Sequence, residues 1–302
     1  MKNSIQGRSL ISIADLSKEE ILTILKKADE IKKKTPKELL KGKILASCFF
    51  EPSTRTRLSF EAAMIRLGGN VIGFSDSTST SAQKGESLHD AIKVIGHYAD
   101  VLVFRHPKDG SARVASEATN KPVLNAGDGI NQHPTQTLLD LFTIKECQGK
   151  LKGLNIAFIG DLKNGRTVHS LSLASAHFDM RLFFVSPSQL GLPDEISHVL
   201  KKQGIKFSFH PTLEEVISKA DILYMTRMQS ERLNPSEREK FKETLILTEG
   251  MLSKAKKNMR VLHPLPRVNE IEATVDKTPH AYYFQQAENG LYVRMALLSL
   301  IL

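Results

Sequence analysis

Residues 43–61 read KILASCFFEPSTRTRLSFE and contain an apolar run, a turn and the start of a helical pattern. The apolar run is typical of a buried strand, and Leu58, Ala62 and Ile65 then recur at helical spacing. A helix start offers unpaired N–H groups and the positive end of its dipole, so it can hold a phosphate together with nearby side chains. Taken alone, the same residues also fit a capped, solvated helix start. The polar candidates at this turn are Ser53, Thr54, Arg55 and Thr56.

The position of this 53–56 turn favours a ligand site. Open α/β folds bind ligands at the carboxyl ends of their strands, and the turn directly follows a predicted strand. The chain has neither the G-x-x-x-x-G-K-[ST] phosphate loop nor the G-x-G-x-x-G dinucleotide fingerprint. We therefore expect the phosphate to belong to a small molecule.

Strand-like and helix-like runs alternate along the rest of the chain. In the second half, the runs LNIAFIGD, RLFFVSP, IKFSFH and DILYMTR are separated by helical stretches, including a short helix between the last two. Such alternation predicts parallel sheets, and 302 residues suffice for two cores. We expect an α/β fold with two doubly wound parallel-sheet lobes. The predicted boundaries are 1–133 plus a C-terminal helix at 286–302 for the first lobe, 150–284 for the second, and a linking helix at 134–149.

The formal net charge of +9 is concentrated in a lysine-rich stretch near the N-terminus. Ser17 and Glu20 have the form of a capping box and open a helix whose lysines would form a solvated face. No nucleic-acid recognition motif accompanies this charge, so we expect neither nucleic acid nor a membrane as a partner. The positions expected to face inward are Ile21, Leu25, Ala28 and Ile31.

Cysteine usage and hydropathy indicate the compartment. Cys48 and Cys147 lack the spacing of a disulfide framework or a zinc site, which fits a reducing environment without a structural metal. The N-terminus has no apolar signal segment, and the longest apolar run, near the C-terminus, is far shorter than the ~20 residues of a membrane span. We expect a cytoplasmic protein.

Other candidate side chains follow predicted strands or lie in loops. The run SDSTSTSAQKGES has no apolar periodicity and carries Lys84, so it is either a binding loop or an exposed linker. Arg105 ends the strand in DVLVFRHP, where it is either a phosphate ligand or a surface residue. His133 and Gln136 begin a helix, and the Gln136 amide suits a ligand with a planar NH2–C=O group.

Two arginines and a proline-rich turn mark the second lobe. Arg166 and Arg227 follow predicted strands, and two guanidinium groups on one edge suit a dicarboxylate, with structural salt bridges as the alternative. In HPLPRVNEI, which begins at His263, the prolines remove backbone donors and leave carbonyls that could accept from an NH2 group.

Together these motifs resemble the aspartate carbamoyltransferase catalytic chains, in family order over nearly the whole length. The resemblance rests on STRTRLSFE, KGES, VFRHP, HPTQTLLDL, GDLKNGRTVHS, TRMQSER and HPLPRVNEI. It implies carbamoyl transfer from carbamoyl phosphate to L-aspartate, an early step of pyrimidine biosynthesis, without cofactor or metal. It also implies an active site in the cleft between the lobes and a homotrimer with shared sites.

The resemblance implies a role for each candidate residue. The implied catalytic residues are Arg55, Thr56, Lys84, Arg105 and His133. The implied ligands of carbamoyl phosphate are Ser53, Thr54, Arg55, Thr56, Arg105, His133, Gln136 and the carbonyls of Pro264 and Leu265, beside a cis Leu265–Pro266 bond. The implied aspartate ligands are Lys84, Arg166, Arg227 and Gln229. Ser81 and Lys84 are expected from a neighbouring subunit.

Two alternatives stay open at this point. Ornithine carbamoyltransferases share the phosphate half but bind a cationic side chain, whereas HPLPR and the pair Arg227 and Gln229 favour a second carboxylate. An inactive member of the family that serves only in interactions is the other alternative. The sequence does not distinguish regulatory chains, a dihydroorotase-type partner or an isolated trimer.

Overall fold

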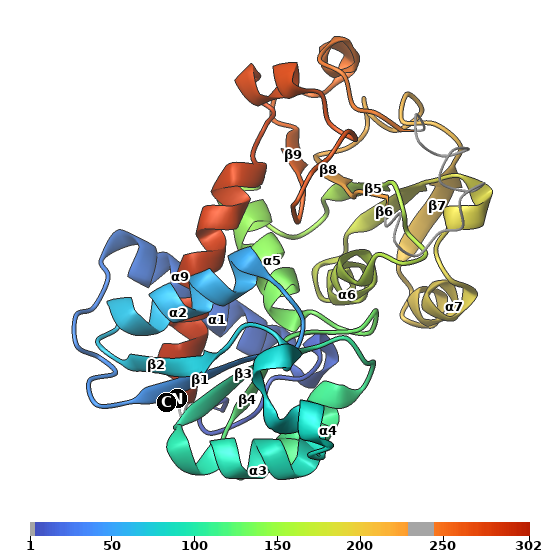
Figure 1. Cartoon of the computed structure of the whole chain (residues 1–302). Helices are drawn as coiled ribbons and strands as arrows, with labels where there is room; N and C mark the ends of the chain where they lie inside the picture. The colour runs from blue at the N-terminus through green and yellow to red at the C-terminus, as the bar shows by residue number, and fades with distance from the viewer. Residues whose placement is uncertain (1–3, 229–244) are drawn as a thin grey trace. The chain divides into compact units, whose positions relative to one another are not determined.

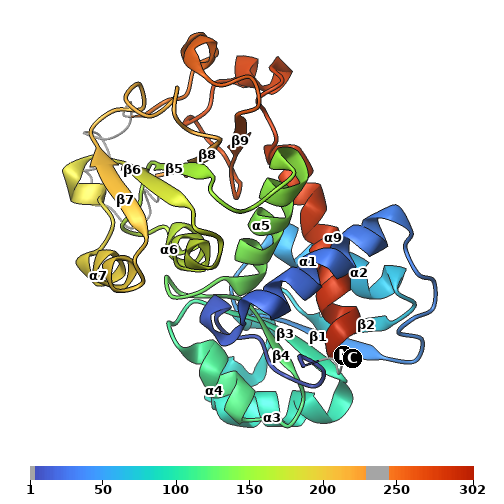
Figure 2. The ribbon, with the colours of Figure 1, turned by 180° about the vertical axis from the view of Figure 1, so that it is seen from behind.

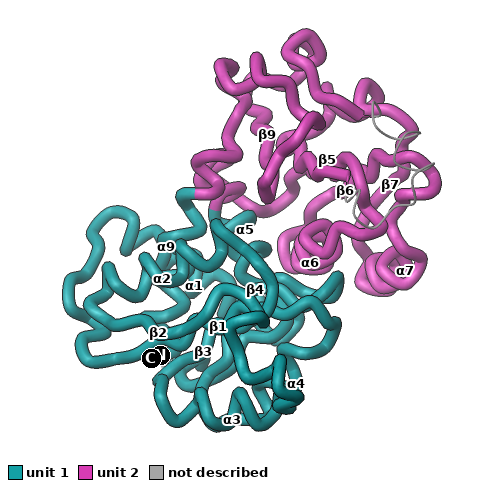
Figure 3. The backbone as a smooth tube through the Cα atoms, viewed as in Figure 1, with its two compact units in different colours: residues 1–142, 288–302 teal, residues 143–287 magenta. Residues whose placement is uncertain are grey.

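The computed structural model describes residues 4–228 and 245–302. The chain divides into two compact units, unit 1 with residues 1–142 and 288–302 and unit 2 with residues 143–287 (Figure 3). The divisions fall inside helices α5 (Pro134–Gln148) and α9 (Tyr283–Ile301). Within the described ranges, no helix has the length and apolar character needed to cross a bilayer.

Unit 1 is built on a parallel four-stranded sheet in the order β2-β1-β3-β4 (Figure 1). The chain passes from β1 to β2 on one side and then returns to β3 on the other side of β1. The direction of winding therefore reverses between β1 and β3, which is where open α/β sheets bind ligands. The strands are β1 (Ile44–Phe49), β2 (Asn70–Phe74), β3 (Val101–His106) and β4 (Val123–Asp128).

Helices cover both faces of this sheet. Helices α3 and α4 lie on one face, and α1, α2 and α9 lie on the other (Figures 1 and 2). The core on the α3 and α4 side contains Cys48, Phe104 and Ala112. The helices are α1 (Lys18–Lys33), α2 (Thr54–Arg66), α3 (Leu88–Tyr98) and α4 (Ser111–Glu117).

The N-terminal helix has the predicted cap and the predicted buried face. The N–H of Glu20 donates to Ser17 Oγ at 3.2 Å, and the N–H of Ser17 donates to Glu20 Oε2 at 2.9 Å. These bonds satisfy donors that a helix start leaves unpaired. The positions expected to face inward are all buried: Ile21, Leu25, Ala28 and Ile31.

The helix predicted after the 53–56 turn is present as α2, but its apolar stripe does not face the core. Leu58 and Ile65 are 50% and 61% exposed. The buried face carries Phe60, Ala63 and Met64 instead. Helical spacing alone defines a face and not the direction in which it points.

Unit 2 contains a parallel five-stranded sheet in the order β7-β6-β5-β8-β9, so its winding reverses between β5 and β8. Alternate residues pack on opposite faces. Ile159 and Val185 join one core, while the rings of Phe158 and Phe184 stack 5.6 Å apart on the other face. Its strands are β5 (Asn155–Ile159), β6 (Arg181–Val185), β7 (Lys206–His210), β8 (Ile222–Met225) and β9 (Arg260–Leu262). The helices that lie wholly within its described residues are α6 (Arg166–Ala174) and α7 (Asp194–Lys202).

The prediction of a short helix between β7 and β8 is wrong, because residues 211–213 form bends and residues 214–219 form turns. The N–H of Ile217 donates to the carbonyl of Leu213 and the N–H of Ala220 donates to that of Val216, but no regular helix results. The remaining short helical elements in the described part of the chain are 3-10 turns. They are η1 (Ile13–Asp15), η2 (Ser77–Ser79), η3 (Ser81–Lys84), η4 (Ser175–Phe178), η5 (Ser188–Leu190), η7 (Gly250–Lys254) and η8 (Ala273–Lys277).

Candidate active site

The predicted phosphate turn lies at the carboxyl end of β1, in unit 1. Ser53 is the N-cap of α2, and its hydroxyl makes no capping hydrogen bond to the helix. Thr54 and Arg55 are exposed, whereas Thr56 is buried. Partial desolvation of the Arg55 side chain lowers its pKa below the usual value, although the guanidinium stays charged at neutral pH. The turn thus combines a helix N-terminus with hydroxyl groups and a cation.

Arg105 reaches the same edge from the neighbouring strand. It pairs in register with Phe49, the last residue of β1, so it stands beside the strand that leads into the turn. Its Nη2 contacts Glu51 Oε1 at 2.7 Å, and its Nη1 donates to the carbonyl of Ala126 at 3.2 Å. Its buried Nε has no hydrogen-bond partner among the residues that the structure describes.

The two guanidinium groups at this edge influence each other. Burial lowers the pKa of Arg105, the Glu51 carboxylate opposes that shift, and the positive charge of Arg55 adds to it. Two cations that repel each other gain from an anion between them. Glu51 was not predicted as part of the site, although it lies in the quoted stretch, because a strand-end carboxylate carries no motif of its own.

The start of α5 supplies the third part of the unit 1 edge, after β4. His133 and Gln136 are both buried. Gln136 Nε2 donates to Asp140 Oδ1 at 2.9 Å, one helical turn further on. Since a glutamine and an acid four residues apart face each other on a helix, the spacing could have identified Asp140 as the residue that orients Gln136.

Ser81 and Lys84 lie together in turn η3, and both are exposed. The loop is shaped by its own hydrogen bonds, since Asp76 accepts from the N–H groups of Thr78 and Ser79. Among the described residues, no hydrogen bond or ion pair joins Lys84 to the 53–56 turn or to Arg105.

In unit 2, Arg166 and Arg227 follow β5 and β8, the two neighbouring strands between which the winding of the sheet reverses. We call this place the switch point of the sheet. Arg166 is the first residue of α6, after β5, and Arg227 comes two residues after the end of β8. The strands pair at their ends, and the N–H of Thr226 donates to the carbonyl of Ile159 at 2.8 Å. Both arginines are half-buried. Gln229, the third predicted aspartate ligand, lies outside the described residues.

The turn after β9 carries Pro264 and Leu265, which are both half-buried. The Leu265–Pro266 peptide bond is cis, as the resemblance implied. Leu265 has a φ of +56°, in the left-handed region that side chains other than glycine seldom adopt. A hydrogen bond to His263 stabilises the turn, since His263 Nδ1 accepts from the N–H of Leu265 at 2.8 Å.

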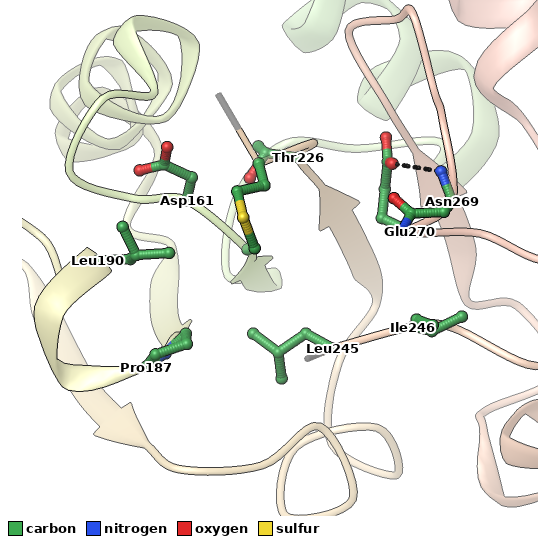
Figure 4. A pocket seen from close by; sticks show the side chains of 10 residues that line it. Asp161, Pro187, Leu190, Thr226, Leu245, Ile246, Asn269 and Glu270 are labelled. Carbon is green, nitrogen blue, oxygen red and sulfur yellow. Dashed lines mark hydrogen bonds between the residues drawn. The ribbon is translucent and has the colours of Figure 1, made fainter. Parts of the chain in front are cut away.

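A small cavity of about 30 Å³ lies at the same edge of the unit 2 sheet (Figure 4). Its polar lining includes Asp161 and Glu270, and no arginine is among the described residues that line it. The lining that the structure describes therefore supplies acidic and apolar side chains, and it lies beside Thr226, next to Arg227. Glu270 accepts from the N–H of Asn269, as Figure 4 shows.

Comparison with known proteins identifies the family of the chain. Residues 8–146 match the model of the aspartate/ornithine carbamoyltransferase carbamoyl-P binding domain, and residues 152–301 match that of the Asp/Orn binding domain. The chain is 58% identical to the aspartate carbamoyltransferase catalytic subunit of Vibrio vulnificus and 56% identical to that of Aliivibrio salmonicida. In both cases the match covers 100% of this chain and 99% of the relative.

Solved structures give the same result. The aspartate transcarbamoylase of Trypanosoma cruzi in complex with N-(phosphonacetyl)-L-aspartic acid has a TM-score of 0.94 at 39% identity, covering 99% of this chain and 97% of that one. The catalytic subunit of the M. jannaschii enzyme has a TM-score of 0.90 at 51% identity, covering 97% of each chain. With both domain models matched and relatives of this identity over its full length, the chain belongs to the aspartate/ornithine carbamoyltransferase family, as an aspartate carbamoyltransferase catalytic chain.

Proposed function

We propose that this chain transfers the carbamoyl group of carbamoyl phosphate to the amine of L-aspartate, giving N-carbamoyl-L-aspartate and phosphate. The observation that carries the proposal is that both sheets have guanidinium groups at their switch points. Arg55 and Arg105 lie at the β1–β3 edge, and Arg166 and Arg227 lie at the β5–β8 edge. The T. cruzi relative has been solved with carbamoyl phosphate and aspartate together, which supports the same pair of substrates here.

Carbamoyl phosphate is assigned to the edge of unit 1. Its phosphate would accept from the helix start and the side chains of the 53–56 turn, with Arg105 as a second cation. Its carbonyl oxygen would face Thr56, Arg105 and His133. Its NH2 group would donate to the Gln136 side-chain oxygen, since the amide nitrogen is already committed to Asp140. The carbonyls of Pro264 and Leu265 are the other proposed acceptors.

Aspartate is assigned to Arg166 and Arg227, with Gln229 completing the set. A guanidinium binds a carboxylate through two parallel hydrogen bonds, so two arginines match the two carboxylates of aspartate. Ornithine would place an ammonium group where the second carboxylate is bound, and an arginine there would repel it. This charge argument favours aspartate over ornithine.

The proposed reaction needs positioned donors more than a reactive side chain. The neutral amine of aspartate attacks the carbamoyl carbon, the C–N bond forms, and the C–O bond to phosphate breaks. The electron pair leaves on the phosphate, which can also accept the amine proton. Because charge grows on the carbonyl oxygen, donors from Thr56, Arg105 and His133 stabilise the transition state more than the ground state. Holding both reactants in attack geometry contributes further, up to about 7–11 kcal/mol at best.

We further propose a homotrimer in which Ser81 and Lys84 complete the site of the neighbouring subunit. Leu58 and Ile65 on α2 and Ile72 on the edge strand β2 are exposed apolar side chains, and a second copy would cover them. The exposed η3 loop follows β2 in the chain and carries Lys84. We place the enzyme in the cytoplasm, where its two free cysteines would stay reduced.

The test is a substrate comparison with the purified chain. Incubation with carbamoyl phosphate and L-aspartate should give carbamoyl-aspartate and phosphate in equal amounts, and ornithine should give no citrulline. If citrulline were the main product, the acceptor of the carbamoyl group would be ornithine and not aspartate. No phosphate release with either amino acid would refute the enzymatic function.

A further inference from the structure

A buried histidine and a buried glutamate lie behind the turn that carries Pro264 and Leu265. His263 is 1% exposed and Glu270 is 7% exposed, and His263 Nε2 lies 2.6 Å from Glu270 Oε1. The backbone N–H of His263 donates to Gln286 Oε1 at 2.7 Å, which fixes the histidine from its other side. Neither residue belongs to the set of substrate ligands proposed above.

The hydrogen bonds determine which ring nitrogen carries the proton. The N–H of Leu265 donates to His263 Nδ1 at 2.8 Å, so Nδ1 must offer its lone pair. In a neutral imidazole the proton then sits on Nε2. That N–H points at Glu270 and donates to its carboxylate. The histidine therefore transmits the position of Glu270 to the backbone of Leu265.

Glu270 receives more donors than this one. Its second oxygen accepts from the N–H of Val268 at 3.0 Å. It also accepts from the N–H of Asn269 at 3.1 Å, the bond drawn in Figure 4. Three N–H groups thus converge on one carboxylate. Burial opposes its ionisation, but the bonds to His263 and the backbone outweigh burial and hold the pKa of Glu270 below its usual value. The group acts as a charged, acceptor-only anchor.

We propose that His263 and Glu270 are positioning residues for carbamoyl transfer. They hold the backbone at Leu265, with its φ of +56°, so that the carbonyls of Pro264 and Leu265 can accept from the carbamoyl NH2 group. Leu265 would otherwise leave the left-handed region, because that conformation is unfavourable for a branched side chain. This inference rests on the proposed function, which names these carbonyls as acceptors.

A glutamine cannot replace Glu270, although it has the same shape. With its oxygen toward His263, its NH2 group faces the N–H groups of Val268 and Asn269. With the amide turned over, its NH2 group faces the Nε2–H of His263. Either orientation sets donors against donors, and a buried unsatisfied donor is costly. Turning the histidine proton to Nδ1 only moves the conflict to the N–H of Leu265.

The experiment compares Glu270→Gln with Glu272→Gln, the same change two residues along at an exposed position. Carbamoyl phosphate kinetics are measured together with inhibition by acetyl phosphate, in which a methyl group replaces the NH2 group. We expect Glu270→Gln to lower kcat/KM for carbamoyl phosphate on the order of tenfold or more. The inhibition constants of acetyl phosphate and inorganic phosphate should stay near those of wild type, since neither has an NH2 group to place. Glu272→Gln should match wild type in all three.

A second measurement does not depend on the folding of that variant. In the wild-type protein, ¹⁵N NMR should show His263 with an unprotonated Nδ1 and a protonated Nε2, and His263→Asn would assign the signal among the ten histidines. An active wild type whose His263 carries its proton on Nδ1 would overturn the inference. Equal losses for carbamoyl phosphate and acetyl phosphate in Glu270→Gln would also overturn it, because they would indicate general damage. A wild type that makes no carbamoyl-aspartate would instead refute the proposed function.

Discussion

Gly160, which follows β5 in unit 2, provides the sharpest test of the aspartate edge. Its φ is +118°, and a Cβ atom there would lie 2.3 Å from the carbonyl oxygen of Thr226, next to Arg227. Backbone atoms cannot give way as the end of a flexible side chain can. Gly160→Ala must therefore separate the ends of β5 and β8 or distort the backbone at Thr226.

Gly204 gives a control with a positive φ but no contact, since its φ is +72° and none of the described residues lies within 4 Å of a Cβ atom there. Gly204→Ala should cost only the conformational term, about 1–2 kcal/mol of unfolding free energy. Gly160→Ala should cost that term plus about 1–3 kcal/mol for the enforced contact. The difference between the two variants reports the close approach of the strands together with the extra backbone strain of a φ of +118° over one of +72°.

The two variants should also differ in kinetics. Because Gly160→Ala shifts the backbone beside Arg227, we expect the KM for aspartate to rise about tenfold, a loss of ~1.4 kcal/mol. Inhibition by inorganic phosphate should be unchanged, since the phosphate turn belongs to unit 1. Denaturant unfolding and steady-state kinetics check both expectations. Equal unfolding free energies for the two alanine variants, with a normal aspartate KM, would refute this reasoning.

Four further predictions follow from the same structure. Arg55→Ala should lower kcat/KM on the order of 100-fold or more by removing a donor from the transition state, as phosphate-release assays would show. Asp140→Ala should raise the KM for carbamoyl phosphate more than Asp140→Asn, because asparagine keeps an acceptor for Gln136; equal effects would contradict that role. Mixing inactive Arg55→Ala and Lys84→Ala trimers should restore part of the activity, and none after confirmed subunit exchange would count against shared sites. The folded-state pKa of Glu270 is lowered, so the stability it contributes should be present above about pH 4.5, its reference value, and be lost as the pH falls through the lower folded value. Unfolding free energies of wild type and Glu270→Gln between pH 3 and 7 check this, and a constant difference would contradict it.

Much of the fold could be predicted because its signals are local. The capping box of Ser17 and Glu20 involves residues three apart, and the alternation of apolar strands with helices is visible over short windows. Where local signals were weak, prediction was wrong or incomplete. Residues 211–220 have enough helical character for single turns but form no regular helix. The helical spacing of Leu58 and Ile65 did not indicate whether these side chains face the core or the surface.

The partners of the site residues were less predictable than the residues themselves. Glu51 meets Arg105 only because β1 and β3 are neighbours in register, although 54 positions separate the two residues. His263 meets Gln286 because α9 starts beside the end of β9. A carboxylate or an amide at such a position resembles any other polar residue in the sequence.

By itself, the sequence determined the strand, turn and helix around residues 53–56, the helix caps, and the set of arginines and hydroxyls that identifies the family. Tertiary structure decided which of these side chains share an edge, which nitrogen of His263 carries its proton, and that Gly160 must lack a Cβ atom. The physical reason is the separation along the chain of the residues that interact. Caps and helical faces arise between residues a few positions apart, whereas strand order and buried hydrogen bonds depend on distant segments that meet only after folding.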